Sequence, residues 1–359
     1  IKYVVLNVGD LFHAGFGANA MAEAAAANDT SVGHEVFWGF MANQGEAIIY
    51  GLIFVAITML IVLGGVGGGI EKVCSIGMPA LFVMLIICIV RACTLEGAVD
   101  GLKYMFVPGW AVANGVIKEA PSFFEVLSTA GGQMFFSLSL GMGAMITYGS
   151  YLDKKENLQK NAILIIVMDT LVALMAGLCV IPGRFALDPS GSLGGPTLLF
   201  VTMQNVFNRM GPVGPIFGIL FYLLVVFAAV SSSISLLEVI VAHFVDKARI
   251  AGKGDKRKPY TLIAAACVGV GCILVCADAL GTSGIAPANL LGMTGDLPGW
   301  SADWLDFWDM LSEGIMMPLG AMLMSLMIGW EIGPDVVKEE CEASGHAMGG
   351  YGFFKVCVK

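Results

Sequence analysis

Long apolar segments recur along the chain and are separated by short polar stretches. Apolar segments long enough to cross a bilayer lie at about 47–66, 73–94, 122–152, 160–182, 213–245, 260–281 and 304–330. Because a helix needs about 20 mainly apolar residues to span the hydrocarbon core, each of them predicts a transmembrane helix. Residues 1–25 are less apolar and fit the outer part of another membrane helix, whereas residues 26–45 are polar and loop-like. The pattern predicts an all-α, polytopic membrane protein.

The third apolar segment is interrupted by small polar residues and glycines. Ser137, Ser139, Gly141 and Gly143 lie in its middle, where an ordinary membrane helix would carry Leu or Val. Hydroxyls and glycines at that depth predict a helix that opens at mid-membrane and offers backbone groups to a ligand. Many secondary transporters bind ions and substrates at such discontinuous helices.

Composition supports a membrane protein and argues against several other classes. Hydrophobic residues make up 57% of the chain and charged residues 13%, and the mean hydropathy is +0.82. The net charge of −9 comes without a basic face, so we expect no nucleic-acid partner. The nine cysteines lie mostly in apolar runs without metal-ligand spacing, which favours packing over a metal site or disulfides. The four histidines are scattered, so we expect no enzyme and no cofactor.

The distribution of Lys and Arg predicts the orientation of the chain. Six basic residues lie in the loop at 246–259, and Lys154 and Lys155 lie in the loop at 152–160. Two spans separate these loops, so both lie on one side, which the positive-inside rule makes cytoplasmic. By parity, loop 67–72 is also cytoplasmic and segment 183–212 faces outward. That outward segment fits either a lid of short helices or an ordinary long loop.

Polar side chains at membrane depth are candidates for ion binding. Asp169 lies in the middle of the 160–182 span, where a lone carboxylate costs several kcal/mol unless a cation or proton neutralises it. Ser231, Ser232 and Ser233 lie in the middle of the 213–245 span, and their hydroxyl oxygens suit a hard cation such as Na⁺. Close helix packing is the alternative explanation for the three serines. Asp306 begins the last span, where a helix-capping role is the alternative to a function.

The chain resembles the neurotransmitter:sodium symporter family, especially its bacterial sodium-dependent amino-acid transporters. The run FFSLSLGMGAMITYGSY at 135–151 is similar to the broken sixth helix of that family. Further matching motifs are Gly69-Ile70-Glu71-Lys72, Met78-Pro79 and Pro108-Gly109-Trp110. The resemblance covers about residues 46–330 and implies a LeuT-like inverted-repeat fold, present in part as helices three to ten.

The resemblance divides the single transporter domain, residues 1–359, along the family's helices. Residues 1–25 correspond to the outer part of helix three, 26–45 to an outward loop, and 46–121 to helices four and five with the loop after them. Broken helix six and helix seven occupy 122–182, an outward lid-like loop 183–212, and helices eight to ten 213–330. Residues 331–359 correspond to a cytoplasmic loop and the start of helix eleven. Helices one and two have no counterpart here, so we expect a chain truncated at both ends.

The resemblance also implies a substrate site. The positions that match substrate-contacting residues of the family are Phe136, Ser139 and Met142 on the broken helix, Ser232 and Leu236 on helix eight, and Tyr3 as a candidate for the third-helix tyrosine. Phe136, Met142 and Leu236 make an apolar pocket, which favours a hydrophobic or aromatic amino acid. Ser139 and Ser232 could bind hydroxyl or amine groups, so monoamine-like substrates stay open.

The resemblance also implies two sodium sites and an outer gate. Ser137 and Asp169 match first-sodium-site positions, and Ala228, Ser231 and Ser232 match the second site. Asp306 resembles the outer-gate carboxylate, and Gln133 lies near that gate and the family's anion site. Because Asp169 already supplies a negative charge, we expect chloride not to be required.

The resulting expectation is a sodium-coupled symporter in the plasma membrane that imports a neutral amino acid by alternating access. Its partners would be the amino acid, sodium ions and the lipid bilayer, with the oligomeric state left open. The alternatives are a transport-inactive receptor or scaffold of the same fold, and an unrelated polytopic membrane protein.

Overall fold

A computed structural model describes residues 1–12, 31–191, 194–254, 256–295 and 298–359, and the described residues form helices and loops without strands. Part of the expected helix-three segment 1–25 and of the loop 26–45 therefore lies outside the described residues. Among the described residues, six helical stretches are long and apolar enough to cross a membrane: Gln44–Leu63, Val66–Cys93, Leu158–Leu187, Gly211–Ile250, Arg257–Asp278 and Trp304–Ile332. The expected span at 122–152 is not among them because its helix is broken.

The described chain divides into two compact units. The first comprises Ile1–Ala120 and Ala173–Gly292, and the second comprises Pro121–Val172 and Met293–Lys359. Helix α10, Leu158–Leu187, contributes to both. The site residues of the sequence analysis are distributed over both units, and each group is described within its own unit.

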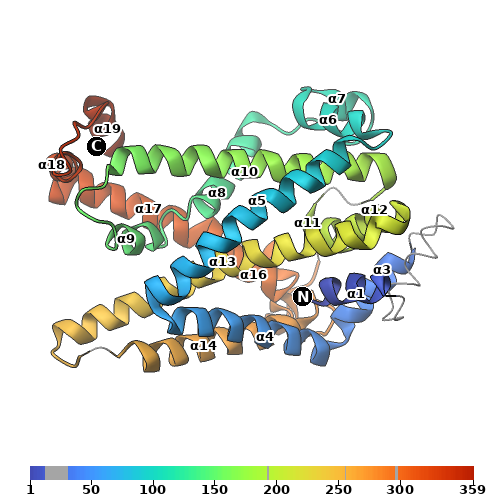
Figure 1. The fold of residues 1–359 in the computed structure, drawn as a ribbon, viewed down its shortest axis with the longest axis horizontal. Coiled ribbons are helices and arrows are strands. Elements are labelled where there is room, and N and C mark those ends of the chain that lie inside the picture. Colours follow the sequence, from blue (N-terminus) through green and yellow to red (C-terminus); the bar gives the residue numbers. More distant parts are fainter. Residues whose placement is uncertain (13–30, 192–193, 255, 296–297) are drawn as a thin grey trace. The chain divides into compact units, whose positions relative to one another are not determined.

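The first unit is built around the 37-residue helix α13, Gly214–Ile250. Helices α1 (Lys2–Leu11), α4 (Gln44–Leu63), α5 (Glu71–Cys93) and α14 (Arg257–Asp278) pack on it. Figure 1 shows α14 running alongside α4. Other elements of this unit are short, and they include α3 (Ser31–Ala42), the π-helix η1 (Val66–Ile70), α6 (Ala98–Phe106), α7 (Trp110–Ala113), η3 (Gly211–Val213) and α15 (Pro287–Leu290). Helix α3 lies in the segment expected to be an outward loop.

Two apolar clusters make the core of the first unit. One surrounds the aromatic rings of Tyr3, Phe207, Phe221 and Tyr222. The other follows the opposite half of α13 from Val230 to Val245, where α4, α5 and α14 meet it. Tight packing of this kind lets α13 hold side chains at fixed positions along its length.

The turn before α5 differs from its expected position. The predicted loop 67–72 is helical, because η1 runs directly into α5. The chain instead reverses at Gly64 and Gly65, and Gly65 has a φ of +78°, which residues with a Cβ rarely adopt. The loop after α13 is likewise shorter than the predicted 246–259, since α13 ends at Ile250 and α14 begins at Arg257.

Segment 183–212 contains short helices after the end of α10. They are α11 (Gly195–Thr197), the π-helix η2 (Leu198–Thr202) and α12 (Met203–Arg209). Helix α10 runs past its predicted end at 182, with Pro182 inside it, to Leu187. Of the two interpretations of this segment, short structured helices describe it better than an irregular loop.

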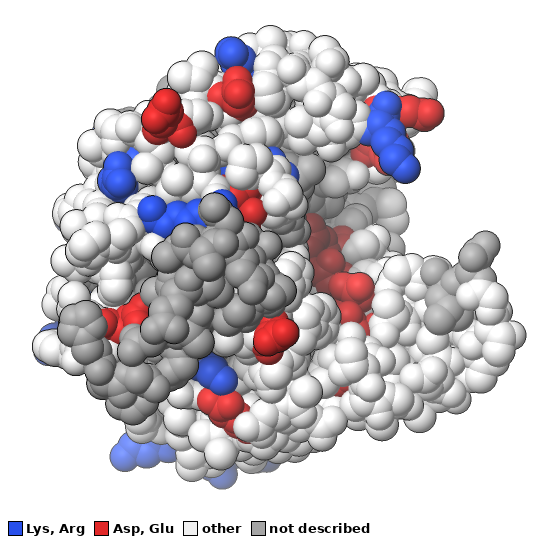
Figure 2. Space-filling model, turned by 90° about the vertical axis from the view of Figure 1, so that its right-hand side faces the viewer, with Lys and Arg blue, Asp and Glu red and all other residues white. Residues whose placement is uncertain are grey.

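The second unit holds the broken helix and the last apolar span. Its elements are α8 (Phe123–Ser137), α9 (Ala144–Gly149), the first part of α10, η4 (Gly299–Ser301), α16 (Trp304–Asp309), η5 (Met310–Met316), α17 (Met317–Leu326), η6 (Met327–Ile332), α18 (Pro334–Glu342) and α19 (Tyr351–Val358). In it α10 exposes a row of apolar side chains from Ile163 to Val167. Such an apolar row suits contact with lipid. The face drawn in Figure 2 is different, because Lys, Arg, Asp and Glu side chains appear at many places on it among uncharged residues.

Candidate ion and substrate site

Helix α8 begins with a strong cap and ends in the middle of the predicted span. Ser122 and Glu125 form a reciprocal capping box at its start. The helix ends at Ser137, and α9 begins at Ala144, so residues 138–143 are irregular. Ser139 has a φ of +54° and Gly141 a φ of +78°. This interruption lies at the small polar residues and glycines from which it was predicted.

Close contact with α17 determines which residues the interruption can contain. A Cβ at Gly141 would lie 2.0 Å from the carbonyl oxygen of Met317, and a Cβ at Gly320 would lie 2.3 Å from that of Gly141. Both distances are far inside van der Waals contact, so only glycine fits at either position. Two facing glycines, Gly141 and Gly320, therefore allow the irregular segment to lie directly against α17.

Ser137 and Asp169 lie side by side at the end of α8. The Ser137 hydroxyl oxygen is 2.8 Å from each carboxylate oxygen of Asp169 on α10. A hydroxyl has one hydrogen, so it can donate to only one of the two oxygens at a time and its lone pairs remain available. Within the described residues, no Lys or Arg forms an ion pair with Asp169. The three oxygens form a hard, negatively charged donor set of the kind that binds alkali and alkaline-earth cations.

The serine cluster of α13 separates into two groups. Ser231 donates its hydroxyl to the carbonyl of Ala228 at 2.8 Å, and Ser232 is exposed. Ser233 instead lies 2.8 Å from the Thr58 hydroxyl of α4. Helix packing, the alternative explanation of the cluster, therefore accounts for Ser233. Ser231 and Ala228 bring a hydroxyl and a carbonyl oxygen together within the first unit.

The predicted substrate residues fall into a group on each unit. Phe136 is half exposed at the end of α8, and Ser139 and Met142 are partly buried in the interruption. On α13, Ser232 is exposed, and Leu236 lines a cavity of about 220 Å³ together with Thr58 of α4 and Val268 of α14. The lining of that cavity is apolar apart from its hydroxyl groups.

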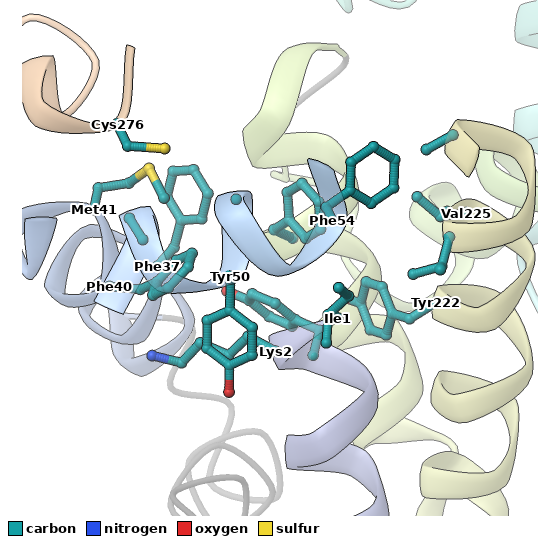
Figure 3. Close-up of a pocket in the computed structure, with 16 residues that line it drawn as sticks. Ile1, Lys2, Phe37, Phe40, Met41, Tyr50, Phe54, Tyr222, Val225 and Cys276 are labelled. Carbon is teal, nitrogen blue, oxygen red and sulfur yellow. The ribbon is translucent and has the colours of Figure 1, made fainter. Parts of the chain in front are cut away.

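Tyr3 lies in an aromatic slot of the first unit. Its ring centroid is 5.1 Å from those of both Phe200 and Tyr222, and the residue is 4% exposed. The Tyr222 hydroxyl donates to the Leu199 carbonyl, whereas the buried Tyr3 hydroxyl has no hydrogen-bond partner among the described residues. Tyr3 also lines a cavity of about 310 Å³, shown in Figure 3, whose other aromatic lining residues are Phe37, Phe40, Tyr50, Phe54, Phe200 and Tyr222.

The two predicted gate residues lie in the second unit. Asp306 is in the first turn of α16, but the side chain that caps this helix is that of Asp303, which accepts the Asp306 backbone N–H at 2.7 Å. Asp306 thus lies in the first turn, where the helix dipole favours a carboxylate, without being the N-cap residue, and its side chain is exposed. Gln133 is exposed on α8.

Two buried polar contacts were not predicted from the sequence. Glu238 is fully buried and accepts two hydrogen bonds from Arg257, which also donates to the Val62 carbonyl at the end of α4. Asn7 of α1 and Gln204 of α12 form a second buried pair. The partner of Glu238 lies on another helix, α14, and the sequence alone does not indicate which basic residue it is.

Comparison with known proteins identifies the family of the chain. The profile of the Sodium:neurotransmitter symporter family matches residues 41–292. The chain is 32% identical over 326 residues to the uncharacterized sodium-dependent transporter YhdH of Bacillus subtilis (strain 168), a match that covers 89% of this chain and 64% of YhdH. An uncharacterized sodium-dependent transporter of Haemophilus influenzae is 31% identical over 302 residues, or 82% of this chain and 58% of the relative.

The fold matches a solved structure as well. The crystal structure of MhsT in complex with L-phenylalanine superposes with a TM-score of 0.73 at 31% identity, and the match covers 99% of this chain and 75% of MhsT. The chain spans less than two thirds of the length of the curated relatives named above. The matched profile covers more than half of the chain, and the fold is that of an amino-acid-bound relative. The chain belongs to the sodium:neurotransmitter symporter family.

Proposed function

We propose that the protein is a sodium-coupled symporter that imports a neutral, hydrophobic or aromatic amino acid by alternating access. The observation that supports the proposal is the contact between Ser137, at the helix interruption after α8, and Asp169 on α10, a helix long and apolar enough to cross a membrane. A carboxylate at membrane depth is costly unless a cation compensates it. Membership in a family with sodium-dependent members supports Na⁺ as that cation.

In this mechanism Na⁺ compensates Asp169 and orders the irregular residues after Ser137. A second Na⁺ is held by the Ala228 carbonyl and the hydroxyls of Ser231 and Ser232, and Asp306 and Gln133 lie at the outer gate. Each Na⁺ that moves inward contributes about 2.3 kcal/mol per 100 mV of membrane potential. Two ions would therefore drive accumulation of an uncharged substrate.

The substrate class follows from the side chains near the interruption. Phe136 and Met142 offer apolar surface, and the flexible Met142 can adapt to rings of different size. MhsT, the structural relative, is bound to L-phenylalanine. We propose a hydrophobic or aromatic amino acid as substrate, chloride independence because Asp169 supplies the compensating charge, and the plasma membrane as the location.

Uptake by reconstituted protein tests the proposal. The full-length protein in proteoliposomes should accumulate radiolabelled phenylalanine or leucine under an inward sodium gradient and not under an inward potassium gradient. Replacing chloride by gluconate should leave the rate unchanged. Absence of sodium-dependent uptake for every neutral amino acid tried would reject the symporter and favour a receptor or scaffold of the same fold.

A further inference from the structure

Two cysteines of α14 present their sulfur atoms on one face of the helix. Cys272 Sγ and Cys276 Sγ lie 4.0 Å apart, and both side chains are partly buried. A spacing of four residues places side chains on the same face of an α-helix, one above the other. The pair therefore forms a dithiol within one helix, although its spacing is not that of a metal motif in a loop.

A glycine of α4 makes room for this dithiol. A Cβ at Gly51 would lie 2.5 Å from Cys272 Sγ and 3.5 Å from Cys276 Sγ. Both thiols therefore lie against the bare backbone of α4, where α4 and α14 run alongside each other (Figure 1). Because any side chain at position 51 would collide with Cys272 Sγ, the two sulfur atoms are confined to a narrow space between the helices.

A third sulfur atom borders the same space. Met41, near the end of α3, and Cys276 line the same cavity of about 310 Å³. In Figure 3 the thioether sulfur of Met41 and the thiol of Cys276 point toward one another. Gly51 lines this cavity too, so the thioether lies on the side of the dithiol that the bare backbone leaves open.

The three sulfur atoms form a soft donor set. Thiolate and thioether ligands select soft ions such as Cu(I), whereas carboxylates and carbonyls suit hard ions such as Mg²⁺ and Ca²⁺. Zn²⁺ takes four ligands from Cys, His and carboxylates. Among the described residues, no three His, Cys, Asp or Glu side chains are grouped to hold a metal. Two thiols and a thioether therefore favour Cu(I) over Zn²⁺.

The spacing of the sulfur atoms fits a three-coordinate ion. Two metal–sulfur bonds of about 2.3 Å that meet at about 120° span about 4.0 Å, whereas a linear ion would need about 4.6 Å. Cys272 Sγ and Cys276 Sγ are already 4.0 Å apart. The dithiol is therefore spaced for a bent arrangement, which leaves one side of the ion for a third ligand.

We infer that Cys272, Cys276 and Met41 form a binding site for Cu(I). The ion displaces the protons of the two thiols and is held by two thiolates of α14 and by the thioether at the end of α3. It thereby joins α14 to α3. All three ligands belong to the first unit, whereas Ser137 and Asp169 belong to the second, so the copper site shares no residue with the sodium site proposed at Asp169.

Cu(I) binding to the purified, reduced protein tests the inference. Wild type should hold one Cu(I) per chain in competition with a colorimetric Cu(I) chelator. Cys272→Ser and Cys276→Ser should each weaken this binding by at least about a hundredfold, since loss of even an outer-shell partner costs about 10–100-fold. Cys267→Ser changes an exposed cysteine of the same helix and should bind as wild type does. Tight binding that survives in Cys272→Ser and Cys276→Ser, or that is absent from wild type, would overturn the inference.

The third ligand is tested separately. Met41→Leu keeps an apolar side chain but removes the thioether, so the affinity for Cu(I) should fall by about tenfold. X-ray absorption should then show two sulfur ligands instead of three. Met59→Leu makes the same change at a methionine of α4 that packs on the second core cluster, and it should keep all three. Three sulfur ligands in Met41→Leu would contradict the assignment of Met41.

Glycine variants test the geometry without removing a ligand. Gly51→Ala places a Cβ against Cys272 Sγ and should weaken Cu(I) binding by about tenfold or more. Gly271→Ala, beside Cys272 in the sequence, adds a Cβ that meets nothing within 4 Å and should bind normally. Thermal unfolding without copper shows that each variant is folded. Equal Cu(I) affinities in the two folded variants would contradict an ion held between α4 and α14.

Discussion

The Ser137 hydroxyl lies 2.8 Å from both carboxylate oxygens of Asp169, at the residue where α8 ends. The contact joins the broken helix to α10 and places a charge beside backbone groups that no longer make regular helical hydrogen bonds. Leu140 N–H, for example, bonds to the Phe135 carbonyl at 2.9 Å, one residue further back than in an α-helix. Charge and irregular backbone at one place are the features that an ion site in a membrane requires.

Neutralising Asp169 should weaken the activation of uptake by sodium. Asp169→Asn removes the negative charge but keeps the shape, so we expect the sodium concentration for half-maximal uptake to rise by about tenfold or more, the effect of removing a charged hydrogen-bonding partner. The measurement is uptake of labelled phenylalanine against sodium concentration. Asp246→Asn, at an exposed carboxylate of α13, is the matched control and should follow the wild-type curve. An unchanged sodium curve in Asp169→Asn would refute the Asp169 assignment alone.

The second proposed sodium site can be tested with neighbouring serines. Ser231→Ala removes the hydroxyl next to the Ala228 carbonyl and should reduce sodium activation of uptake several-fold. Ser233→Ala makes the same chemical change but removes the contact with Thr58, so it should lower thermal stability slightly without changing sodium dependence. Equal sodium curves for the two variants would count against a site at Ser231.

Gly141 should tolerate no side chain. Alanine there must adopt a positive φ, at about 1–2 kcal/mol, and must also push the Met317 carbonyl away. We expect Gly141→Ala to lower uptake by at least about tenfold. Gly131→Ala on α8, where a Cβ would meet nothing within 4 Å, should transport normally. Normal transport by Gly141→Ala would mean that the irregular segment can move away from α17 without loss.

Breaking the Glu238–Arg257 pair should destabilise the first unit. Arg257→Met leaves the fully buried Glu238 carboxylate unpaired, and loss of one partner of a buried ion pair costs about 3–5 kcal/mol. The double variant Glu238→Leu/Arg257→Met should lose less stability than either single variant. Thermal unfolding in detergent measures this. Lys103→Ala, which breaks an exposed ion pair with Asp100, should cost at most about 1 kcal/mol.

Hydropathy and small residues predicted the helices and the position of the break. The apolar segments became helices with boundaries within a few residues of expectation, except at loop 67–72, where the π-helix η1 continues into α5. Such a π-helix depends on packing: a Cβ at Gly69 would meet the Ile61 carbonyl at 2.0 Å. Sequence periodicity does not report contacts of that kind.

The sequence could not reveal which polar side chains far apart in the chain pair with each other. The sequence indicates Asp169 because a charge inside an apolar run is costly, and the apolar run is visible in the neighbouring residues. Gln204 has no comparable signal, because an amide in a mixed segment such as 198–209 fits an exposed position as well as a buried one. Its partner Asn7 becomes apparent only when α1 and α12 are brought together.

A sodium ion at Asp169 should promote substrate binding. Equilibrium binding of labelled phenylalanine to the purified full-length protein, measured over a sodium titration, tests this coupling. Linkage requires that sodium tighten substrate binding and that substrate tighten sodium binding by the same factor. We expect the Kd for phenylalanine to fall as the sodium concentration rises, with a weaker effect in Asp169→Asn. A Kd that is the same in sodium and in potassium would contradict it.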